Sequence, residues 1–346
     1  MDRRGFITST FSLPLAIALP AHAGATPPAR RPMDAGRSGT VGHAEVTTVR
    51  EVINAFTRAD ERLGGGSGRT AIAEYLATDA TTYLQARPAS SRIRAQMYGA
   101  VAEVARLCGW KAHDQGRDGL AQRYYLHAWQ LAREADPAHG AFVLRLMAHQ
   151  AVDLGHSRHA VHIAECARAA ARSRADTATL GQLHLAEARA HAATGNARAA
   201  RTALNKAEHC INTHSSGAER PWWASAMGAP QPLLATHTAK VLADLGDPSA
   251  QRHLAAAVRR WSPDLYPRVR ALNLCDLGSY HAKRGAVEPA YEALKEALEL
   301  LHGITSARAR TAVIQFRAML SPHRNRGGAA VAHTDELAAQ WLNAAR

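Results

Sequence analysis

Charged residues, histidines and a tryptophan recur at similar distances before a series of glycines in this chain. If each glycine ends the first helix of a hairpin, these side chains point to the concave side of a stack of hairpins. Arginine makes bidentate contacts with carboxylates and phosphates and tryptophan offers apolar area, so the set predicts a site for a peptide, a protein or a small-molecule ligand. An alternative interpretation is a ladder of ion pairs between repeats, and the sequence does not separate the two. The predicted ligand- or partner-binding residues are Glu103, Arg106, Trp110, His113, Asp114, Arg145, His149, Asp153, Gln182, Arg189, Lys240 and Asp244.

A repeat of about 40 residues runs through most of the chain, with one longer interval where a segment is inserted. In each unit a turn glycine is followed by alanines on one face of the next helix, where small side chains let helices pack closely. The predicted fold class is all-α, a tetratricopeptide-like right-handed helical-repeat solenoid. The first unit reads Gly109, Gly116, Ala121, Tyr125 and Ala128, which is similar to the tetratricopeptide signature. The later turn glycines are Gly155, Gly195, Gly246 and Gly285, and the alanines that follow them are Ala160, Ala167, Ala200, Ala207, Ala250, Ala257, Ala290 and Ala297.

The chain divides into four predicted segments. Residues 1–23 hold paired arginines, a short apolar run and an Ala-His-Ala end, a pattern that fits a twin-arginine export signal or an apolar connector. The apolar run is too short for a transmembrane segment, and we expect a cytoplasmic protein, with export through the twin-arginine route as the alternative. The predicted segments that follow are a disordered linker at residues 24–44 and the repeat domain at residues 45–320. Residues 321–346 are predicted to form a flexible link and a C-terminal helix.

Composition and motifs argue against several function classes. The 42 Lys and Arg residues exceed the 29 Asp and Glu residues and give a net charge of +13, but the basic residues are spread through the repeats. Such spreading is typical of a solvated surface, so direct nucleic-acid binding is not expected without a separate DNA-binding domain. His159, His162 and Cys166 share one helical face that the repeat phase turns outwards, and the four cysteines show no zinc spacing. We therefore predict no metal and no cofactor, and the absence of catalytic motifs predicts no enzyme activity.

The inserted segment contains two adjacent tryptophans, Trp222 and Trp223. Large aromatic side chains in a loop need cover from neighbouring elements. We expect the pair to pack across the repeats, and a ligand lid is the alternative.

Several short motifs give the chain a resemblance to a known family. They are Phe56-Thr57-Arg58-Ala59-Asp60, Gly64-Gly65-Gly66, Tyr75-Leu76, residues 102–110, Asp114, Gly116, residues 119–124 and Leu131-Ala132. In these motifs the chain resembles the C-terminal half of actinobacterial transcriptional regulators that join a helix-turn-helix of the xenobiotic-response-element type to a tetratricopeptide-like module. The resemblance covers about residues 45–320, and the residues before 45 hold no three-helix pattern.

The resemblance implies a module that binds a peptide, small ligand or protein and thereby biases a DNA-binding partner. The expected function is accordingly regulatory, with a ligand or partner bound on the concave face. An exported scaffolding protein is the first alternative, and an arginine-rich surface that binds nucleic acid is the second. A homodimer is a possible oligomeric state that the sequence does not decide.

Overall fold

The computed structural model describes residues 39–171, 174–214, 220–225, 228–323 and 328–344, and this part of the chain is all-α apart from two short strands. Predicted segment 1–23 and most of the predicted linker lie outside the described residues. None of the described helices is both long and apolar enough to cross a membrane. The elements are β1 (Thr40–Val41), α2 (His43–Leu63), α3 (Arg69–Tyr75), the π-helix η1 (Leu76–Ala80), α4 (Thr81–Gln85), β2 (Arg87–Pro88), α5 (Ser91–Asp114), α6 (Asp118–Ala135), α7 (Pro137–Asp153), α8 (Ser157–Ala171), α9 (Thr177–Ala193), α10 (Ala197–Thr213), α11 (Trp222–Ser225), α12 (Pro230–Asp244), α13 (Ala250–Arg260), α14 (Pro267–Lys283), α15 (Val287–Leu300), α16 (Ala307–Leu320), the 3₁₀ turn η2 (Ser321–His323) and α17 (Gly328–Ala344).

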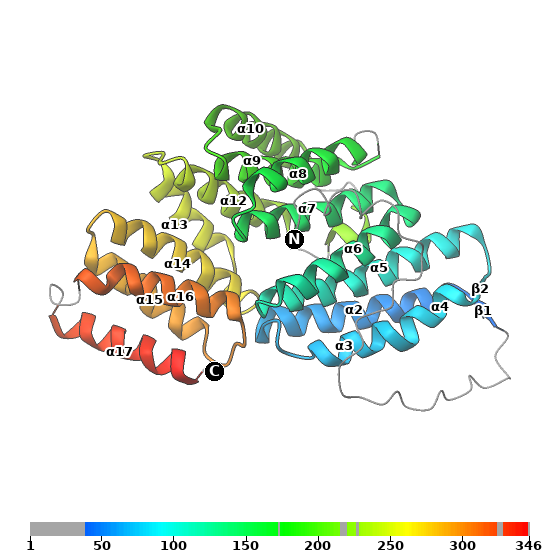
Figure 1. Cartoon of the computed structure of the whole chain (residues 1–346), viewed down its shortest axis with the longest axis horizontal. Coiled ribbons are helices and arrows are strands. Elements are labelled where there is room, and N and C mark those ends of the chain that lie inside the picture. Colours follow the sequence, from blue (N-terminus) through cyan, green and yellow to red (C-terminus); the bar gives the residue numbers. More distant parts are fainter. Residues whose placement is uncertain (1–38, 172–173, 215–219, 226–227, 324–327, 345–346) are drawn as a thin grey trace, which may run out of the picture. The chain divides into compact units, whose positions relative to one another are not determined.

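Consecutive helices pair into hairpins, and the hairpins pack in chain order (Figure 1). The pairs are α5–α6, α7–α8, α9–α10, α12–α13 and α14–α15. The first helix of each pair also contacts the first helix of the next, from α5 through α7, α9, α12 and α14 to α16. These first helices are buried over much of their surface, whereas α8, α10 and α13 bury one alanine-rich face and expose the other.

The glycines that mark the repeat lie in left-handed turns, as the sequence predicts. Gly116 has a φ of +69°, and the four later glycines have φ values from +67° to +76°. A Schellman bond closes the first turn, because the N–H of Arg117 donates to the carbonyl of Ala112 at 2.8 Å. The same bond from the residue after the glycine closes the other four turns, through His156, Asn196, Asp247 and Ala286. Only glycine adopts this conformation without steric cost, which explains its recurrence.

The predicted small-residue face is confirmed as the packing face. Ala121, Tyr125 and Ala128 are fully or almost fully buried. All eight alanines predicted to follow the later glycines are likewise buried. Their size lets the second helix of each hairpin approach its neighbours closely.

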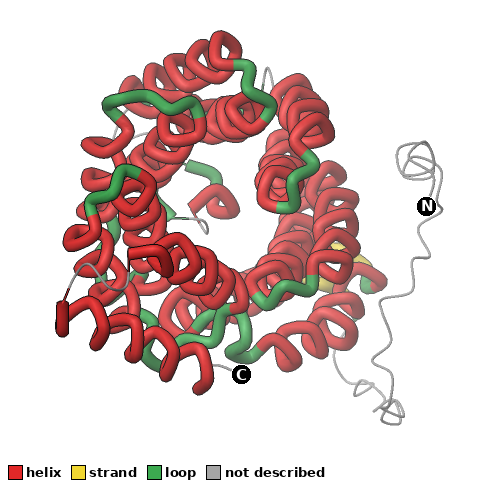
Figure 2. The backbone as a smooth tube through the Cα atoms, turned by 60° about the vertical axis from the view of Figure 1, so that its left-hand side comes forward, coloured by secondary structure: helices red, strands yellow, loops and turns green. Residues whose placement is uncertain are grey.

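The two ends of the hairpin row meet. Helix α2 contacts α14, and α5 contacts α16. The N–H of Thr305 donates to the carbonyl of Leu63 at 2.9 Å, and the N–H of Gly66 donates to the carbonyl of Thr305 at 3.3 Å. At Gly64, whose φ is +86°, an added Cβ would lie 2.3 Å from the carbonyl oxygen of Thr305, so the glycine run permits this approach as well as ending α2. Figure 2 shows the helices of residues 41–346 curving around a central space.

Helix α11 of the inserted segment packs against the first repeats, as predicted for the tryptophan pair. The Trp223 side chain is only 4% exposed, and its ring stacks on the ring of His139 with centroids 4.7 Å apart and an interplanar angle of 5°. The guanidinium of Arg50 in α2 lies over the ring of Trp222, 4.4 Å from its centroid. Through these contacts α11 joins α2 to α7.

Candidate functional site

A cavity of about 520 Å³ lies among the first helices of the hairpins. Its lining comes from both ends of the row, with residues of α2, α5, α12, α14 and α16, and also from α6 and α7. Trp110, Trp261 and Tyr266 give it aromatic surface, and charged side chains of both signs line the remainder. Five of the predicted binding residues line this cavity, namely Arg106, Trp110, His113, Asp153 and Lys240.

Part of the predicted set forms ion pairs between neighbouring inner helices. The carboxylate of Asp153 lies 3.5 Å from Nε2 of His113, whose Nδ1 binds Asp118 at 2.6 Å, and 3.9 Å from the guanidinium of Arg189. Arg189 is also 3.9 Å from Asp244, and Lys240 pairs with Asp276. These contacts match the alternative interpretation of a ladder. Although burial alone acts in the opposite direction, the hydrogen bond from His113 and the charges of Arg308 and Arg189 lower the pKa of Asp153 below its ordinary value.

A second group of buried charged residues joins the two ends of the hairpin row and so closes the row into a ring. Arg268 of α14 donates to Asp60 at 2.5 Å and to Asp114 at 2.8 Å, and all three side chains are buried. Lys111 donates to Asp60 at 3.2 Å and Trp110 donates to it at 3.0 Å. Burial raises the pKa of Asp60, but the charges of Arg268 and Lys111 outweigh it and hold that pKa below its ordinary value.

The predicted residue Asp114 therefore binds within the protein. Its carboxylate accepts from the hydroxyl of Ser306 at 2.9 Å and from the N–H of Gly65 at 2.8 Å, besides Arg268. All its partners belong to segments far from it in the chain. Asp114 thus helps to join the two ends of the hairpin row and is not part of the cavity lining.

Glu103 and Arg106 form a buried pair on α5, with Nε of Arg106 2.6 Å from the carboxylate. The other carboxylate oxygen of Glu103 lies 2.9 Å from Nε2 of His139, whose ring stacks on Trp223. Burial raises the pKa of Glu103, while Arg106 and His139 together lower it below its ordinary value. The inserted segment is thus connected to an inner charged pair.

Several other inner polar groups have no hydrogen-bond partner among the described residues. Arg145 is 2% exposed and Gln182 is fully buried, yet Nε and Nη2 of Arg145 and both amide atoms of Gln182 are unpaired. The rings of His149 and His237 stack with centroids 4.6 Å apart, and each has one buried nitrogen without a partner. Buried polar groups are nearly always satisfied in folded proteins, so this cluster calls for a partner.

Sequence reasoning missed several residues of this region. His237 lies three residues before Lys240, hence on the same helical face, and that spacing could have identified it. Glu61 also lines the cavity, and burial, followed by the charge of Asp60, raises its pKa to about 7. The sequence around Arg268 does not indicate its role, because its partners Asp114 and Asp60 lie 154 and 208 residues away in the chain.

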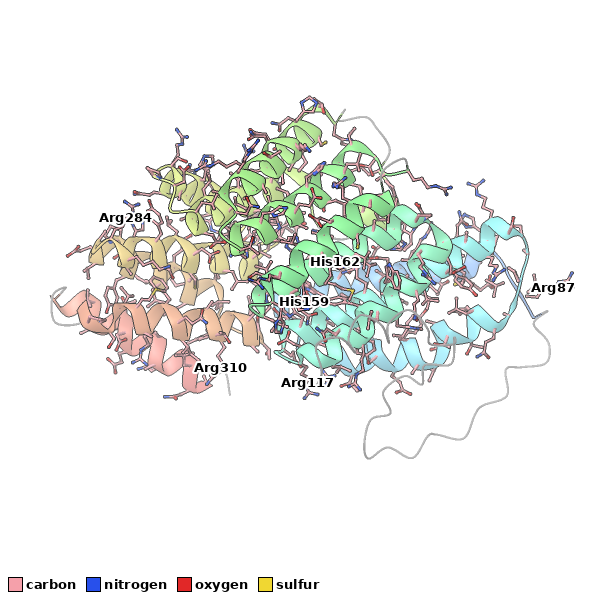
Figure 3. All side chains as sticks on the ribbon, turned by 45° about the horizontal axis from the view of Figure 1, so that its top comes forward. Arg87, Arg117, His159, His162, Arg284 and Arg310 are labelled. Carbon is pink, nitrogen blue, oxygen red and sulfur yellow. The ribbon has the colours of Figure 1, made fainter. Side chains whose placement is uncertain are left out.

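A second hollow of about 540 Å³ lies among α8, α9 and α10, and charged side chains such as Glu165, Arg168 and Lys206 line it. Figure 3 shows His159 and His162 on α8, and Sγ of Cys166 is 3.7 Å from His162 on the same exposed helix. Among the described residues, no group of three or more metal-binding side chains is placed to hold an ion. The arginines labelled in Figure 3 lie on well-separated elements, in agreement with a dispersed basic surface.

No protein-family model matches the sequence, and a search of curated proteins finds no match.

Proposed function

We propose that the repeat region, residues 45–320, is a tetratricopeptide-like right-handed solenoid that works as a regulatory ligand-binding module. The order of the hairpins, the five glycine turns and the buried alanine faces support the repeat assignment. The motif resemblance to ligand-responsive transcriptional regulators supports a regulatory role. DNA would be contacted through a separate DNA-binding domain.

The observation that carries this proposal is the cavity between the two ends of the row. Its volume of about 520 Å³ lies within the range of small-molecule sites, and three aromatic side chains line it beside charged groups. A ligand of that size is a small molecule or a short peptide. We therefore favour these two classes over a folded protein partner.

The position of the cavity suggests how binding would be signalled. Its walls come from α2 and α5 at one end of the row and from α14 and α16 at the other, so a bound ligand would contact both ends. Such a ligand has higher affinity for the closed arrangement than for an open one, and it shifts the population towards the closed arrangement. A change in the curvature of the hairpin row is the signal that a partner would read.

The test is selection of a ligand from a small-molecule and peptide extract of the host by the purified full chain. Thr311 lines the cavity and its side chain is exposed there, so Thr311→Trp fills the space. The matched control is Thr48→Trp, because Thr48 is an exposed threonine of α2 outside the cavity lining.

The proposal expects a compound that the native chain and Thr48→Trp retain and that Thr311→Trp loses. Adding the identified compound should change the solution scattering profile and raise the unfolding temperature of the native chain. A compound bound equally by all three proteins would contradict the cavity assignment. Binding that leaves scattering and stability unchanged would contradict the regulatory role.

A further inference from the structure

Among the described residues, the buried guanidinium of Arg145 has no ion-pair partner. It is 2% exposed, and neither Nε nor Nη2 has a hydrogen-bond partner. Its guanidinium carbon lies 4.4 Å from the centroid of the Phe142 ring. A cation–π contact offsets only part of the cost of removing an arginine from water.

The charges around Arg145 do not compensate it. Arg106 and Arg220 act on it with the same sign, and Glu103, a carboxylate that acts in its favour, is already bound to Arg106 and His139. Burial, followed by these two arginines, lowers the pKa of Arg145 to about 9, so the guanidinium is still charged at neutral pH. Among the described groups that act most strongly on Arg145, positive charges therefore outnumber the one paired carboxylate.

Two imidazoles on which Arg145 acts electrostatically each have a buried nitrogen without a partner among the described residues. Arg145 acts electrostatically on both His149 and His237, which stack on each other. Burial, together with the surrounding positive charges, puts the pKa of both rings well below the ordinary value, so both are neutral at pH 7. A neutral imidazole donates one N–H, and each ring has a buried unpaired nitrogen. On the neighbouring helix α9, the buried amide of Gln182 is also unpaired.

This cluster adjoins the cavity through His237, which lines it together with Arg106. Arg145 and His149 are not part of the lining, but both act electrostatically on His237. Two carboxylates of the cavity lining are already paired, since Asp153 lies beside His113 and Arg308 and Asp276 binds Lys240. A ligand in the cavity meets the cationic Arg106 and the imidazole of His237 in a wall that also contains carboxylates.

We propose that the ligand of the cavity carries an anionic group, a carboxylate or a phosphate, and that the guanidinium of Arg145 binds this group with the help of His149 and His237. The inference rests on the proposed function and assigns the ligand class of the same cavity. A planar guanidinium with free Nε and Nη2 positions matches the two oxygens of either anion. Binding would supply the missing negative charge and the missing acceptors together.

The experiment measures thermal unfolding of the full chain at pH 7 in rising concentrations of inorganic phosphate or of acetate. Chloride keeps the ionic strength constant. The native chain is compared with Arg145→Met and with Arg252→Met, since Arg252 is an exposed arginine of α13 that forms no ion pair with any residue the structure describes. Arg145→Lys is a further variant that keeps the charge but loses the bidentate geometry.

The proposal expects a saturable rise of the unfolding temperature of the native chain with at least one of the two anions. Arg145→Met should weaken the apparent Kd at least tenfold, Arg145→Lys should weaken it less, and Arg252→Met should leave it within twofold. A response to phosphate alone identifies a phosphate-bearing ligand, and a response to acetate alone identifies a carboxylate.

The result that overturns the proposal is a native chain that neither anion stabilises beyond chloride, or a response of equal size in Arg145→Met. If Arg145→Met does not fold, the titration of the native chain and of Arg145→Lys still decides. A neutral compound that native protein selects from the host extract and that Thr311→Trp loses would leave the proposed function standing and reject only the anionic class.

Discussion

Replacing Arg268 by methionine should open the ring at its closure. The substitution removes the cation that joins Asp60 and Asp114 and leaves two buried carboxylates. Losing one partner of a buried ion pair costs about 3–5 kcal/mol. Asp60 keeps Lys111 and Trp110, and Asp114 keeps Ser306 and Gly65, so we expect the lower end, about 3 kcal/mol.

Hydrogen exchange measures this opening directly. The N–H groups of Gly65, Gly66 and Thr305 donate across the closure, so their exchange reports its separation. A loss of about 3 kcal/mol corresponds to exchange roughly 100-fold faster at these amides. Amides within the α9–α10 hairpin, which lies away from the closure, should change by less than about twofold.

The control is Arg270→Met on the same helix. Arg270 pairs with Glu296 at 2.8 Å, but that carboxylate is 45% exposed. An exposed pair contributes at most about 1 kcal/mol, and exchange at the closure should stay near that of the native chain. If Arg268→Met also left Gly65, Gly66 and Thr305 within twofold of the native chain, the buried network would not hold the two ends together.

Three further perturbations test the packing and the charges. Gly278→Ala would place a Cβ 2.1 Å from Cζ of the buried Phe316 ring, so we expect a loss of about 1–3 kcal/mol in the free energy of unfolding, seen as a lower urea midpoint. Trp223→Ala removes the ring that stacks on His139 and should cost about 3 kcal/mol, measured by urea denaturation against Trp222→Ala. Because the folded state lowers the pKa of Asp60, the unfolded chain binds this proton first, and stability is lost as the pH falls below about 3.8, with a shallower loss in Asp60→Asn.

The elements of the fold are readable from sequence because their determinants are local. A left-handed turn requires glycine, so Gly116 and Gly155 mark helix ends directly, and the alanine spacing identifies the packing face of the following helix. The same periodicity selected Arg106 and Trp110, which line the cavity.

The closure of the ring could not be predicted in this way. The partners of Arg268 lie 154 and 208 residues away, and helical periodicity carries no information about which distant helix is met. Local spacing also places Asp114 beside His113 at the end of one helix, although in the structure Asp114 turns to Arg268 and His113 to the cavity. Neighbouring positions of one helix thus divide between a structural and a candidate binding role.

Native mass spectrometry of the protein isolated from its own host tests the central claim, that the inner cavity binds an anionic ligand, most directly. The account predicts a non-covalent adduct whose released component carries a carboxylate or phosphate, and it predicts loss of this adduct from both Arg145→Met and Thr311→Trp. A bare polypeptide mass that stays bare after exposure to host extract would contradict the account, as would an adduct retained unchanged by both variants.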